Sequence, residues 1–385
     1  DESREETSNN WGTLAIISER EKGSSELNLG YRVSTDFFEF NPLFTPNEHE
    51  MTQQFANFKN SFELGQRSTF VLGLQYVNKE VESTDRGNHE NTSLAAYGIL
   101  THSFDNGLFA NASLRAENDD NFGTEVLPQV SLSYIKENWV FRTSYGKSIR
   151  AADFTERYVS FLIPNLSPGR NAGNPDLEAE RSNSFDLGAD YKNKGLDFSI
   201  TGFYRASTNL IDFALTNQLD IPNLTNLQDS ADYLYARNIT ESDVLGLELT
   251  VGLKDYTINS NLKGALRLNY TYLETSGETG ELSKYISNHP VHNFSFLFDL
   301  AFQETLGLNL NGNYLTRQEE IVESIQGEIP ASYFLMNTKV YWNITPDISV
   351  YGKVLNTLDT QYQEILGAQA PGRWWLLGVN WNFKK

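Results

Sequence analysis

The sequence contains no cysteine, so neither disulfide bonds nor thiolate metal ligands can stabilise this chain. Basic residues are also scarce. The 30 Lys and Arg residues stand against 50 Asp and Glu residues, and the resulting net charge of −20 argues against a nucleic-acid-binding protein with a basic face. No apolar run approaches the roughly 18 residues that a membrane-spanning helix needs. Disulfide scaffolds and helical membrane proteins are therefore excluded, and a nucleic-acid binder with a basic face is disfavoured.

Alternation of apolar and polar residues dominates what is present. In the middle of the chain, every second residue is apolar: Leu245, Leu247, Leu249, Val251 and Leu253 alternate with Gly246, Glu248, Thr250 and Gly252. A helix cannot sort these residues onto two faces, because its apolar positions must recur every three or four residues. The pattern therefore predicts β-strands.

Seventeen such runs follow one another along the chain, and their connections alternate between short and long. One of the short connections, Asp105-Asn106-Gly107, carries the Asn-Gly pair of a tight hairpin turn. This arrangement predicts an up-and-down antiparallel sheet whose two ends differ. The predicted strands are 11–19, 26–35, 51–62, 69–77, 93–103, 108–115, 128–135, 139–147, 183–191, 196–211, 244–253, 262–273, 292–302, 306–316, 332–343, 348–355 and 373–383.

The length of these strands and their polar faces favour a membrane barrel. Many runs reach about nine to twelve residues, which is enough for a tilted strand to cross the hydrocarbon layer of a membrane. Asn309, Asn311 and Asn313 share one face of a single strand, which suits a water-filled lumen better than a dry core. We therefore expect an all-β transmembrane barrel of up-and-down antiparallel strands. A soluble β-sandwich or β-solenoid is the alternative.

Several motifs occur in an order that resembles a known family. They are RAENDDNF at 115–122, TSYGKSIRAADFTERY at 143–158, GRNAGNPDLEAE at 169–180 and KVLNTLDTQYQEILGAQAPGRWWLLGVNWNF at 353–383. Over about residues 90–385, this series resembles the C-terminal barrel of TonB-dependent outer-membrane receptors. Gly378, Trp381 and Phe383 resemble the C-terminal signal read by the barrel assembly machinery, although Leu376 stands where a polar residue is usual and two lysines follow the aromatic residue.

The resemblance implies a larger barrel than this chain can form. Members of the family have 22 strands and an N-terminal plug that fills the lumen, whereas this sequence has 17 predicted strands and no plug. An odd number of strands cannot close as one antiparallel barrel. We therefore expect residues 11–385 to be the C-terminal part of such a barrel and residues 1–10 to be an exposed outer-loop remnant. The plug and the remaining strands would be missing or on another chain.

Ligand capture is expected on the long outer loops, where aromatic residues lie near arginines. Aromatic faces beside guanidinium groups suit flat, partly anionic metal chelates, although the same residues equally suit loops that pack on one another. The candidate ligand-binding residues are Arg157, Tyr158, Phe161, Arg170, Phe213, Tyr233, Tyr235, Arg237, Arg317, Glu319 and Tyr362.

Metal binding and catalysis have little support in the sequence. Glu117, Asp119 and Asp120 place three carboxylates within four residues, enough for a weak structural calcium site, with solvated loop charge as the alternative. No other cofactor is indicated. The sequence holds no P-loop, nucleophile elbow or H-E-x-x-H segment, so we do not expect an enzyme.

The function implied by the resemblance is energised uptake of a metal-organic nutrient across the outer membrane of a Gram-negative-type bacterium. An iron–siderophore or haem is the first expectation, and cobalamin or an oligosaccharide the second. The implied partners are outer-membrane lipid, the plug, the TonB–ExbB–ExbD complex, the barrel assembly machinery and a surface lipoprotein cap. A passive porin and a barrel-anchored surface scaffold are the alternatives from other classes.

Overall fold

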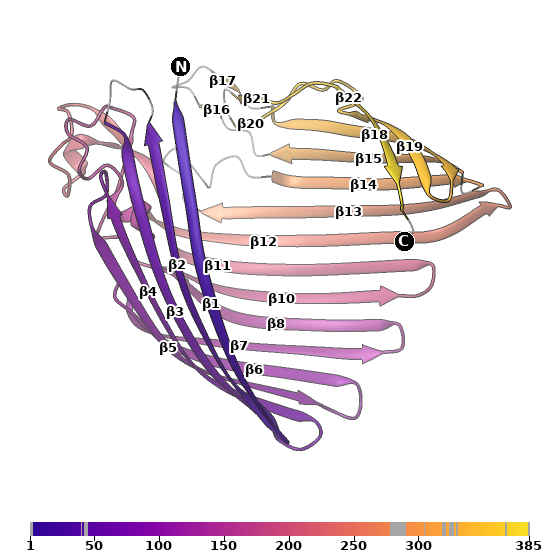
Figure 1. Cartoon of the computed structure of the whole chain (residues 1–385), viewed down its shortest axis with the longest axis horizontal. Helices are drawn as coiled ribbons and strands as arrows, with labels where there is room; N and C mark the ends of the chain where they lie inside the picture. The colour runs from indigo at the N-terminus through magenta and orange to yellow at the C-terminus, as the bar shows by residue number, and fades with distance from the viewer. Residues whose placement is uncertain are drawn as a thin grey trace.

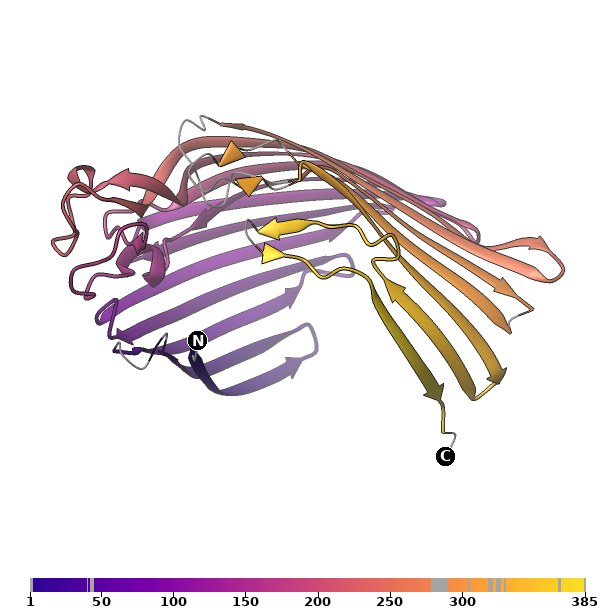
Figure 2. The same ribbon diagram turned by 90° about the horizontal axis from the view of Figure 1, so that it is seen from above.

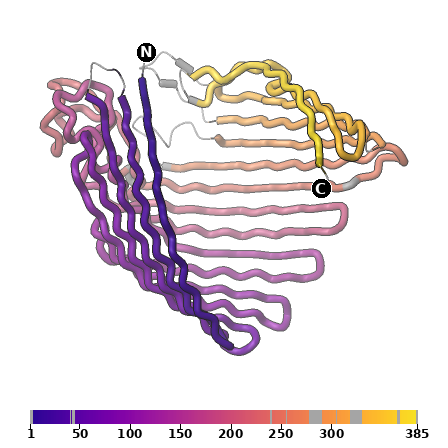
Figure 3. The backbone as a smooth tube through the Cα atoms, in the orientation of Figure 1, coloured from indigo at the N-terminus to yellow at the C-terminus, as the bar shows by residue number. Residues whose placement is uncertain are grey.

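Seventeen long strands of this chain pair in sequence order to form one curved sheet (Figure 1). The computed structural model describes residues 3–39, 41, 45–277, 290–303, 305–317, 321–322, 327–328, 330–365 and 368–383. Every consecutive pair of long strands is antiparallel, and the chain runs back and forth across the sheet in the tube view of Figure 3. The predicted up-and-down topology is confirmed.

Each of the seventeen predicted runs overlaps one long strand. The strands are β1 (Arg4–Arg20), β2 (Gly23–Glu39), β3 (Asn47–Glu63), β4 (Ser68–Ser83), β5 (His89–Ser103), β6 (Leu108–Asp119), β7 (Gly123–Lys136), β8 (Trp139–Arg150), β10 (Glu180–Lys192), β11 (Leu196–Asn217), β12 (Asp232–Asn259), β13 (Leu262–Gly277), β14 (Pro290–Phe302), β15 (Leu306–Arg317), β18 (Ser332–Thr345), β19 (Ile348–Leu355) and β22 (Trp374–Trp381).

The remaining elements are short and lie in the connections. They are α1 (Phe154–Tyr158), β9 (Asn171–Ala172), the 3-10 turn η1 (Gln218–Asp220), β16 (Ile321–Val322), β17 (Gly327–Glu328), β20 (Gln363–Ile365) and β21 (Ala368–Gln369). In the part of the chain that the structure describes, no helix is both long and apolar enough to cross a membrane.

The sheet is an open trough with two edges. Figure 2 shows a single curved layer, with the first strands on one side and the last strands on the other. Within the described ranges, β1 pairs only with β2 and β22 pairs only with β19. Strand β1 begins at Arg4. Most of residues 1–10, which we expected to be an outer-loop remnant, therefore belong to the first strand.

The two faces of the sheet differ in the way that the alternation predicted. One face, which we call the apolar face, exposes a row of large hydrophobic side chains that includes Leu72, Leu74, Leu94, Leu114, Val130, Phe141, Leu187, Leu245, Val340 and Trp342. The opposite, polar face carries cross-strand pairs such as Asn57 with Gln75 and Ser113 with Gln129. In a membrane barrel the apolar face meets lipid and the polar face lines the lumen.

A soluble sandwich is wrong for this chain. All the long strands belong to one sheet, and the other sheets in the described residues are the two-residue and three-residue pairs β16–β17 and β20–β21. The clusters of buried hydrophobic residues lie in the connections and the ends of β11 and β12 at one end of the sheet, and not between two layers. The apolar face therefore has no protein layer to cover it.

Five cross-strand pairs place an aromatic ring flat over a glycine of the neighbouring strand. At each of these glycines a Cβ atom would overlap the facing ring, so a larger residue there would require the ring to move. The pairs are Tyr97 with Gly73, Phe203 with Gly246, Phe296 with Gly312, Tyr341 with Gly307 and Tyr351 with Gly378.

Single-cysteine labelling tests the assignment of the two faces, because the chain has no cysteine of its own. In membranes, a fluorophore on Leu74→Cys should be quenched by a nitroxide-bearing lipid. A fluorophore on the neighbouring Gln75→Cys should instead be quenched by iodide in water, since adjacent strand residues face opposite sides. Equal quenching by iodide at both positions would show that the apolar face does not meet lipid.

Candidate functional site

The long connections gather at one end of the sheet, which we call the loop end. They join β2 to β3, β4 to β5, β6 to β7, β8 to β10, β11 to β12, β13 to β14, β15 to β18 and β19 to β22, as Figure 1 shows for the described segments. Several of them are shorter than predicted. Strand pairing continues through most of 78–92 and 116–127, and only 84–88 and 120–122 lie between strands. The strands therefore extend beyond the length that alternation alone revealed.

Two connections and the loop ends of β11 and β12 pack together into a compact unit, the loop lobe, which consists of residues 151–179 and 210–238. Strand β9 pairs in parallel with β12, and an isolated bridge joins Leu166 to Leu227. Tyr233 is 0% exposed, and its hydroxyl donates a hydrogen bond to the Leu166 carbonyl at 3.0 Å and accepts one from the Gln228 N–H at 2.8 Å. The hydrophobic core of the lobe contains Ala152, Leu166, Ala172, Leu177, Ile211, Phe213, Ile221, Leu224, Tyr233, Tyr235 and Ala236.

Three candidate ligand-binding residues belong to this core. Phe213, Tyr233 and Tyr235 are 2%, 0% and 5% exposed. Their aromatic faces are covered by other residues of the lobe and cannot meet a ligand in this conformation. For these three residues the structure supports loop packing, the alternative that the sequence left open.

The other candidates of the lobe lie at its surface or near it. Arg170 and Arg237 are exposed, whereas Arg157, Tyr158 and Phe161 are half-buried. The Arg157 guanidinium lies 5.9 Å from the centre of the Tyr158 ring and donates to the Pro175 carbonyl. Here an arginine lies beside an aromatic pair, because the Tyr158 and Phe161 rings meet edge to face at 5.7 Å. The Nε and Nη1 atoms of Arg157 are buried, and the Tyr158 ring also stacks on His89 at 3.4 Å.

Charged residues fasten the lobe to the sheet. Arg150, at the end of β8, donates to Glu156 of α1 at 2.9 and 3.0 Å and to Glu180 of β10 at 2.6 and 2.7 Å. Glu180 also accepts the Ile211 N–H at 2.8 Å. Burial raises the pKa of Glu180, but the Arg150 guanidinium and the Ile211 N–H together lower it below the usual value, so this carboxylate stays charged. Asp153 caps α1 by accepting the Glu156 N–H at 2.8 Å.

A second group of candidates meets at the loop end of β15 and β18. Tyr333 brings Arg317 and Tyr362 together: its ring centre lies 5.6 Å from the Arg317 guanidinium and 4.9 Å from the Tyr362 ring. The Tyr333 hydroxyl donates to Glu364 at 3.2 Å, and burial raises the pKa of this hydroxyl. The sequence pattern missed Tyr333, although its place at the start of a predicted strand was a usable signal. Glu319 lies outside the described residues.

The polar face of β3–β8 holds a cavity of about 860 Å³ near the loop end. Arg115 and Ser93 both donate to Glu117, at 2.7 and 2.6 Å, and Tyr97 donates to Asn57 at 3.1 Å. The polar groups of the lining are therefore largely hydrogen-bonded to one another, and apolar residues such as Phe55, Val77 and Ile99 lie between them.

The carboxylates considered for calcium lie beside this cavity but do not form a metal site. Protein donors occupy them: Asp119 accepts hydrogen bonds from Asn91 and from the Asn121 N–H, and Asp120 accepts the Thr92 N–H. Across the described residues, no three His, Cys, Asp or Glu side chains are placed so that they could hold a metal ion. The expected calcium site is therefore not assembled from Glu117, Asp119 and Asp120.

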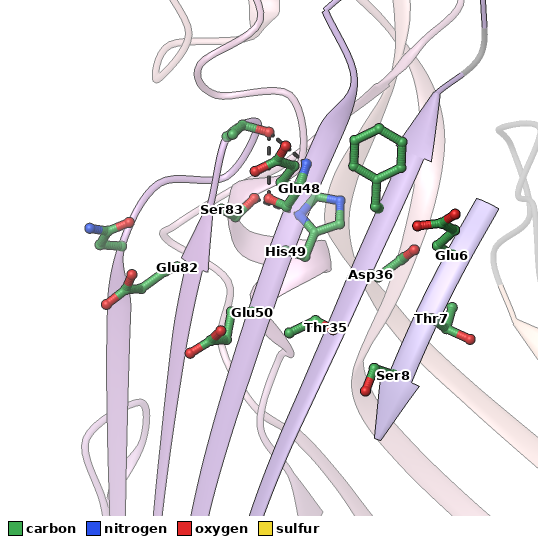
Figure 4. A pocket seen from close by; sticks show the side chains of 13 residues that line it. Glu6, Thr7, Ser8, Thr35, Asp36, Glu48, His49, Glu50, Glu82 and Ser83 are labelled. Atoms are coloured by element: carbon green, nitrogen blue, oxygen red, sulfur yellow. Dashed lines mark hydrogen bonds between the residues drawn. The ribbon is translucent and has the colours of Figure 1, made fainter. Parts of the chain in front are cut away.

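A second cavity, of about 930 Å³, lies at the loop end of β1–β4 (Figure 4). Its only histidine, His49, makes a 2.7 Å hydrogen bond through Nδ1 to Ser83 and lies 3.8 Å from Asp85. Burial and the Arg86 guanidinium lower the pKa of His49, although Asp85 and Asp36 oppose them. The acidic residues that line the cavity are Glu6, Asp36, Glu48, Glu50 and Glu82. Sequence reasoning missed this cavity because alternation assigns a face to each residue but does not say which strands are in register.

The C-terminal residues expected as an insertion signal lie on the last strand and just beyond it. Gly378 sits beneath the Tyr351 ring, and the Trp381 and Phe383 rings stack at 4.3 Å. Both of these rings are exposed. Such exposure suits recognition by another protein, and the role of the three residues stays a prediction.

The buried hydroxyl of Tyr233 predicts how the loop lobe is stabilised. Tyr233→Phe should destabilise the lobe by about 1–3 kcal/mol, because the Gln228 N–H loses its buried acceptor and the Leu166 carbonyl loses its buried donor. Limited proteolysis within 151–179 should be faster, while the sheet keeps its protection. The matched control Tyr31→Phe changes an exposed tyrosine and should have no effect. An unchanged cleavage rate in Tyr233→Phe would contradict this role.

The lowered pKa of His49 predicts a pH-dependent loop end. The folded protein keeps this imidazole neutral, so below about pH 6.5 the opened segment binds more protons than the folded one. The free energy of opening should therefore be level above that pH and decrease as the pH falls below it. The protection factors of 47–51 and 83–86, which correct for the slower chemical exchange in acid, should fall on acidification in the native protein but less in His49→Gln.

His102→Gln is the control for this experiment, because His102 lies at the opposite end of the sheet, bonded to Ser68. It should leave the pH dependence of the loop end intact. The assignment fails if His49→Gln and the native protein respond to acid equally.

Comparison with known proteins identifies the family. Residues 4–356 match the family model described as "TonB dependent receptor-like, beta-barrel". The vitamin B12 transporter BtuB of Vibrio cholerae serotype O1 is 21% identical over 383 residues, which covers 96% of this chain and 56% of that protein. BtuB of Photobacterium profundum is 22% identical over 330 residues, covering 84% of this chain and 49% of that protein. The chain thus spans about half the length of these curated relatives.

Solved structures share the fold. The ferric enterobactin receptor PfeA of Pseudomonas aeruginosa gives a TM-score of 0.75 at 18% identity, covering 98% of this chain and 62% of that one. The FrpB iron transporter of Neisseria meningitidis gives a TM-score of 0.72 at 15% identity, covering 98% and 64%. The sheet therefore has the fold of part of the barrel in these structures. Because the family model covers nearly the whole chain, this protein belongs to the TonB-dependent receptors, which are transport proteins of the bacterial outer membrane and not enzymes.

Proposed function

We propose that this chain forms the barrel part of a receptor that takes up a metal-organic nutrient with energy from the TonB–ExbB–ExbD complex. An iron–siderophore or haem is the preferred ligand class, with cobalamin or an oligosaccharide as the alternative. The proposed partners also include a plug and the strands that complete the barrel, a surface lipoprotein cap, and an assembly machinery that reads Gly378, Trp381 and Phe383. Family membership favours this function over a passive porin or a surface scaffold.

The observation that carries the proposal is the placement of arginines beside aromatic rings at the loop end. Arg157, Tyr158 and Phe161 lie together on the loop lobe, and Arg317 and Tyr362 lie together around Tyr333. A guanidinium supplies directed donors and positive charge, and a ring supplies a flat face. Flat, oxygen-rich metal chelates present both complementary features.

The relatives support a metal-organic ligand but do not distinguish between an iron chelate and cobalamin. The matched curated relatives are named as vitamin B12 transporters, whereas the matched structures include ferric enterobactin and siderophore receptors. Both kinds of ligand are metal-organic compounds. We prefer an iron chelate because the surface groups of the loop end that suit a ligand are arginines, which favour an anionic ligand.

Uptake by a receptor-deletion strain tests this proposal. Carrying the full-length receptor, the strain should regain growth on an iron–siderophore or haem as the sole iron source. Arg317→Ala should weaken ligand binding about tenfold, equivalent to about 1.4 kcal/mol, because a charge-assisted contact is lost. Arg67→Ala is the matched control, since Arg67 pairs with Asp105 in a turn at the opposite end.

Two results would count against the proposal. If only cobalamin uptake is restored, the preferred ligand class is wrong and the alternative holds. If Arg317→Ala binds as well as Arg67→Ala, the ligand does not contact the group around Tyr333.

A further inference from the structure

Two lysines face each other on the polar face of the last strands. Lys339 of β18 and Lys353 of β19 are direct cross-strand partners, and both are half-buried. Their strands show the opposite side to lipid, where Val340 and Trp342 are exposed. The two ammonium groups therefore belong to the wall of the lumen.

Neither lysine has an acidic partner in the described part of the chain. The residues directly across the neighbouring strands are Asn309 beside Lys339 and Leu376 beside Lys353. The next residue across the sheet from Asn309 is Asp299, and its carboxylate accepts a hydrogen bond from the side-chain amide of Asn309. Like charges placed directly opposite each other destabilise a sheet, so this pair is unfavourable unless a negative group lies between or above it.

Aromatic rings hold one of the two lysines in place. The Lys339 ammonium lies 4.6 Å from the centre of the Tyr351 ring and 5.9 Å from that of Tyr341. Both rings lie close to glycines of the neighbouring strands, Tyr351 to Gly378 and Tyr341 to Gly307. The cation–π contacts order Lys339 but leave its positive charge uncompensated.

Several other cations on the polar face have acidic partners. Arg115 pairs with Glu117, Arg142 with Asp190, and Lys254 with Asp197. In a chain with a net charge of −20, acidic partners are plentiful. Lys339 and Lys353 differ from these pairs because two cations, neither with an acidic partner among the described residues, lie directly opposite each other.

We propose that Lys339 and Lys353 form a binding site for a carboxylate in the lumen. A carboxylate has two oxygens and can accept one charge-assisted hydrogen bond from each ammonium group, which converts the repulsion into two attractions. The carboxylate could come from an acidic side chain of a polypeptide that occupies the lumen or from a free small anion. The site does not depend on which nutrient the receptor carries.

Zero-length coupling with a water-soluble carbodiimide tests this site on the full-length receptor. The reagent joins an amine to a carboxylate as an amide, with loss of one water, and only where the two groups touch. Mass spectrometry should find Lys339 or Lys353 linked to an Asp or Glu of the polypeptide. In a second arm with added citrate, a citrate adduct on the same lysines would identify a free anion as the occupant.

Two comparisons complete the experiment. Lys353→Met should lower the coupling of Lys339 about tenfold, because the second ammonium no longer holds the carboxylate, whereas Lys353→Arg keeps the charge and should keep the coupling. Lys194, an exposed residue of a turn, reports indiscriminate reaction.

The proposal is overturned if Lys339 and Lys353 react no more than Lys194 in both arms. It is equally overturned if Lys353→Met, verified as folded by its heat-modifiable mobility, couples at Lys339 like the native protein. Either result would leave the growth test of nutrient uptake unaffected.

Discussion

The structure depends on the requirement that the backbone groups of a chain in lipid find their partners within the protein. Between β1 and β22, successive antiparallel strands meet this requirement by pairing with the strands on both sides. Such a sheet has two faces, and one residue in two points to each. The alternation along the sequence, the hydrophobic content of only 39% and the absence of long apolar runs all follow from this geometry.

The same constraint explains where the dry core lies. A single-layer wall has lipid on one side and the lumen on the other, so its side chains cannot form a protein interior. The clusters of buried hydrophobic residues in the described chain lie instead in the loop lobe, around Tyr233 and Phe213. There, above the strands, a connection must bury its own apolar groups as a small soluble domain does.

The sequence predicted the sheet well because alternation is a local property. All seventeen strands and their order were accessible, but their ends were not: pairing in β4 to β7 extends into segments whose composition resembles loops. Register was also inaccessible, and with it the acidic cavity around His49, which residues of four strands create. A period of two fixes the face of a residue but not its neighbour across the strand.

The candidate ligand residues show a second limit. Aromatic residues of a long loop can either meet a ligand or bury one another, and composition is the same in both cases. The packing of 151–179 against 210–238 decides this for Tyr233 and Tyr235, which are buried, and leaves Arg170 and Arg237 exposed. For Arg317 and Tyr362 the deciding contact is with Tyr333, a residue that no pattern linked to them.

The charges at the loop end are unevenly distributed, and this bears on what can bind there. Glu48, Glu50 and Glu82 make the cavity of β1–β4 strongly acidic, whereas arginines lie on the loop lobe and at the end of β15. The loop lobe is not positive overall, because residues 151–179 and 210–238 hold eight Asp and Glu residues against three Arg residues. An anionic ligand is therefore repelled from the cavity of β1–β4, and at the rest of the loop end it is attracted by individual guanidinium groups and not by the net charge of the surface. Directed hydrogen bonds and the shape of the surface must then supply most of the selectivity for such a ligand.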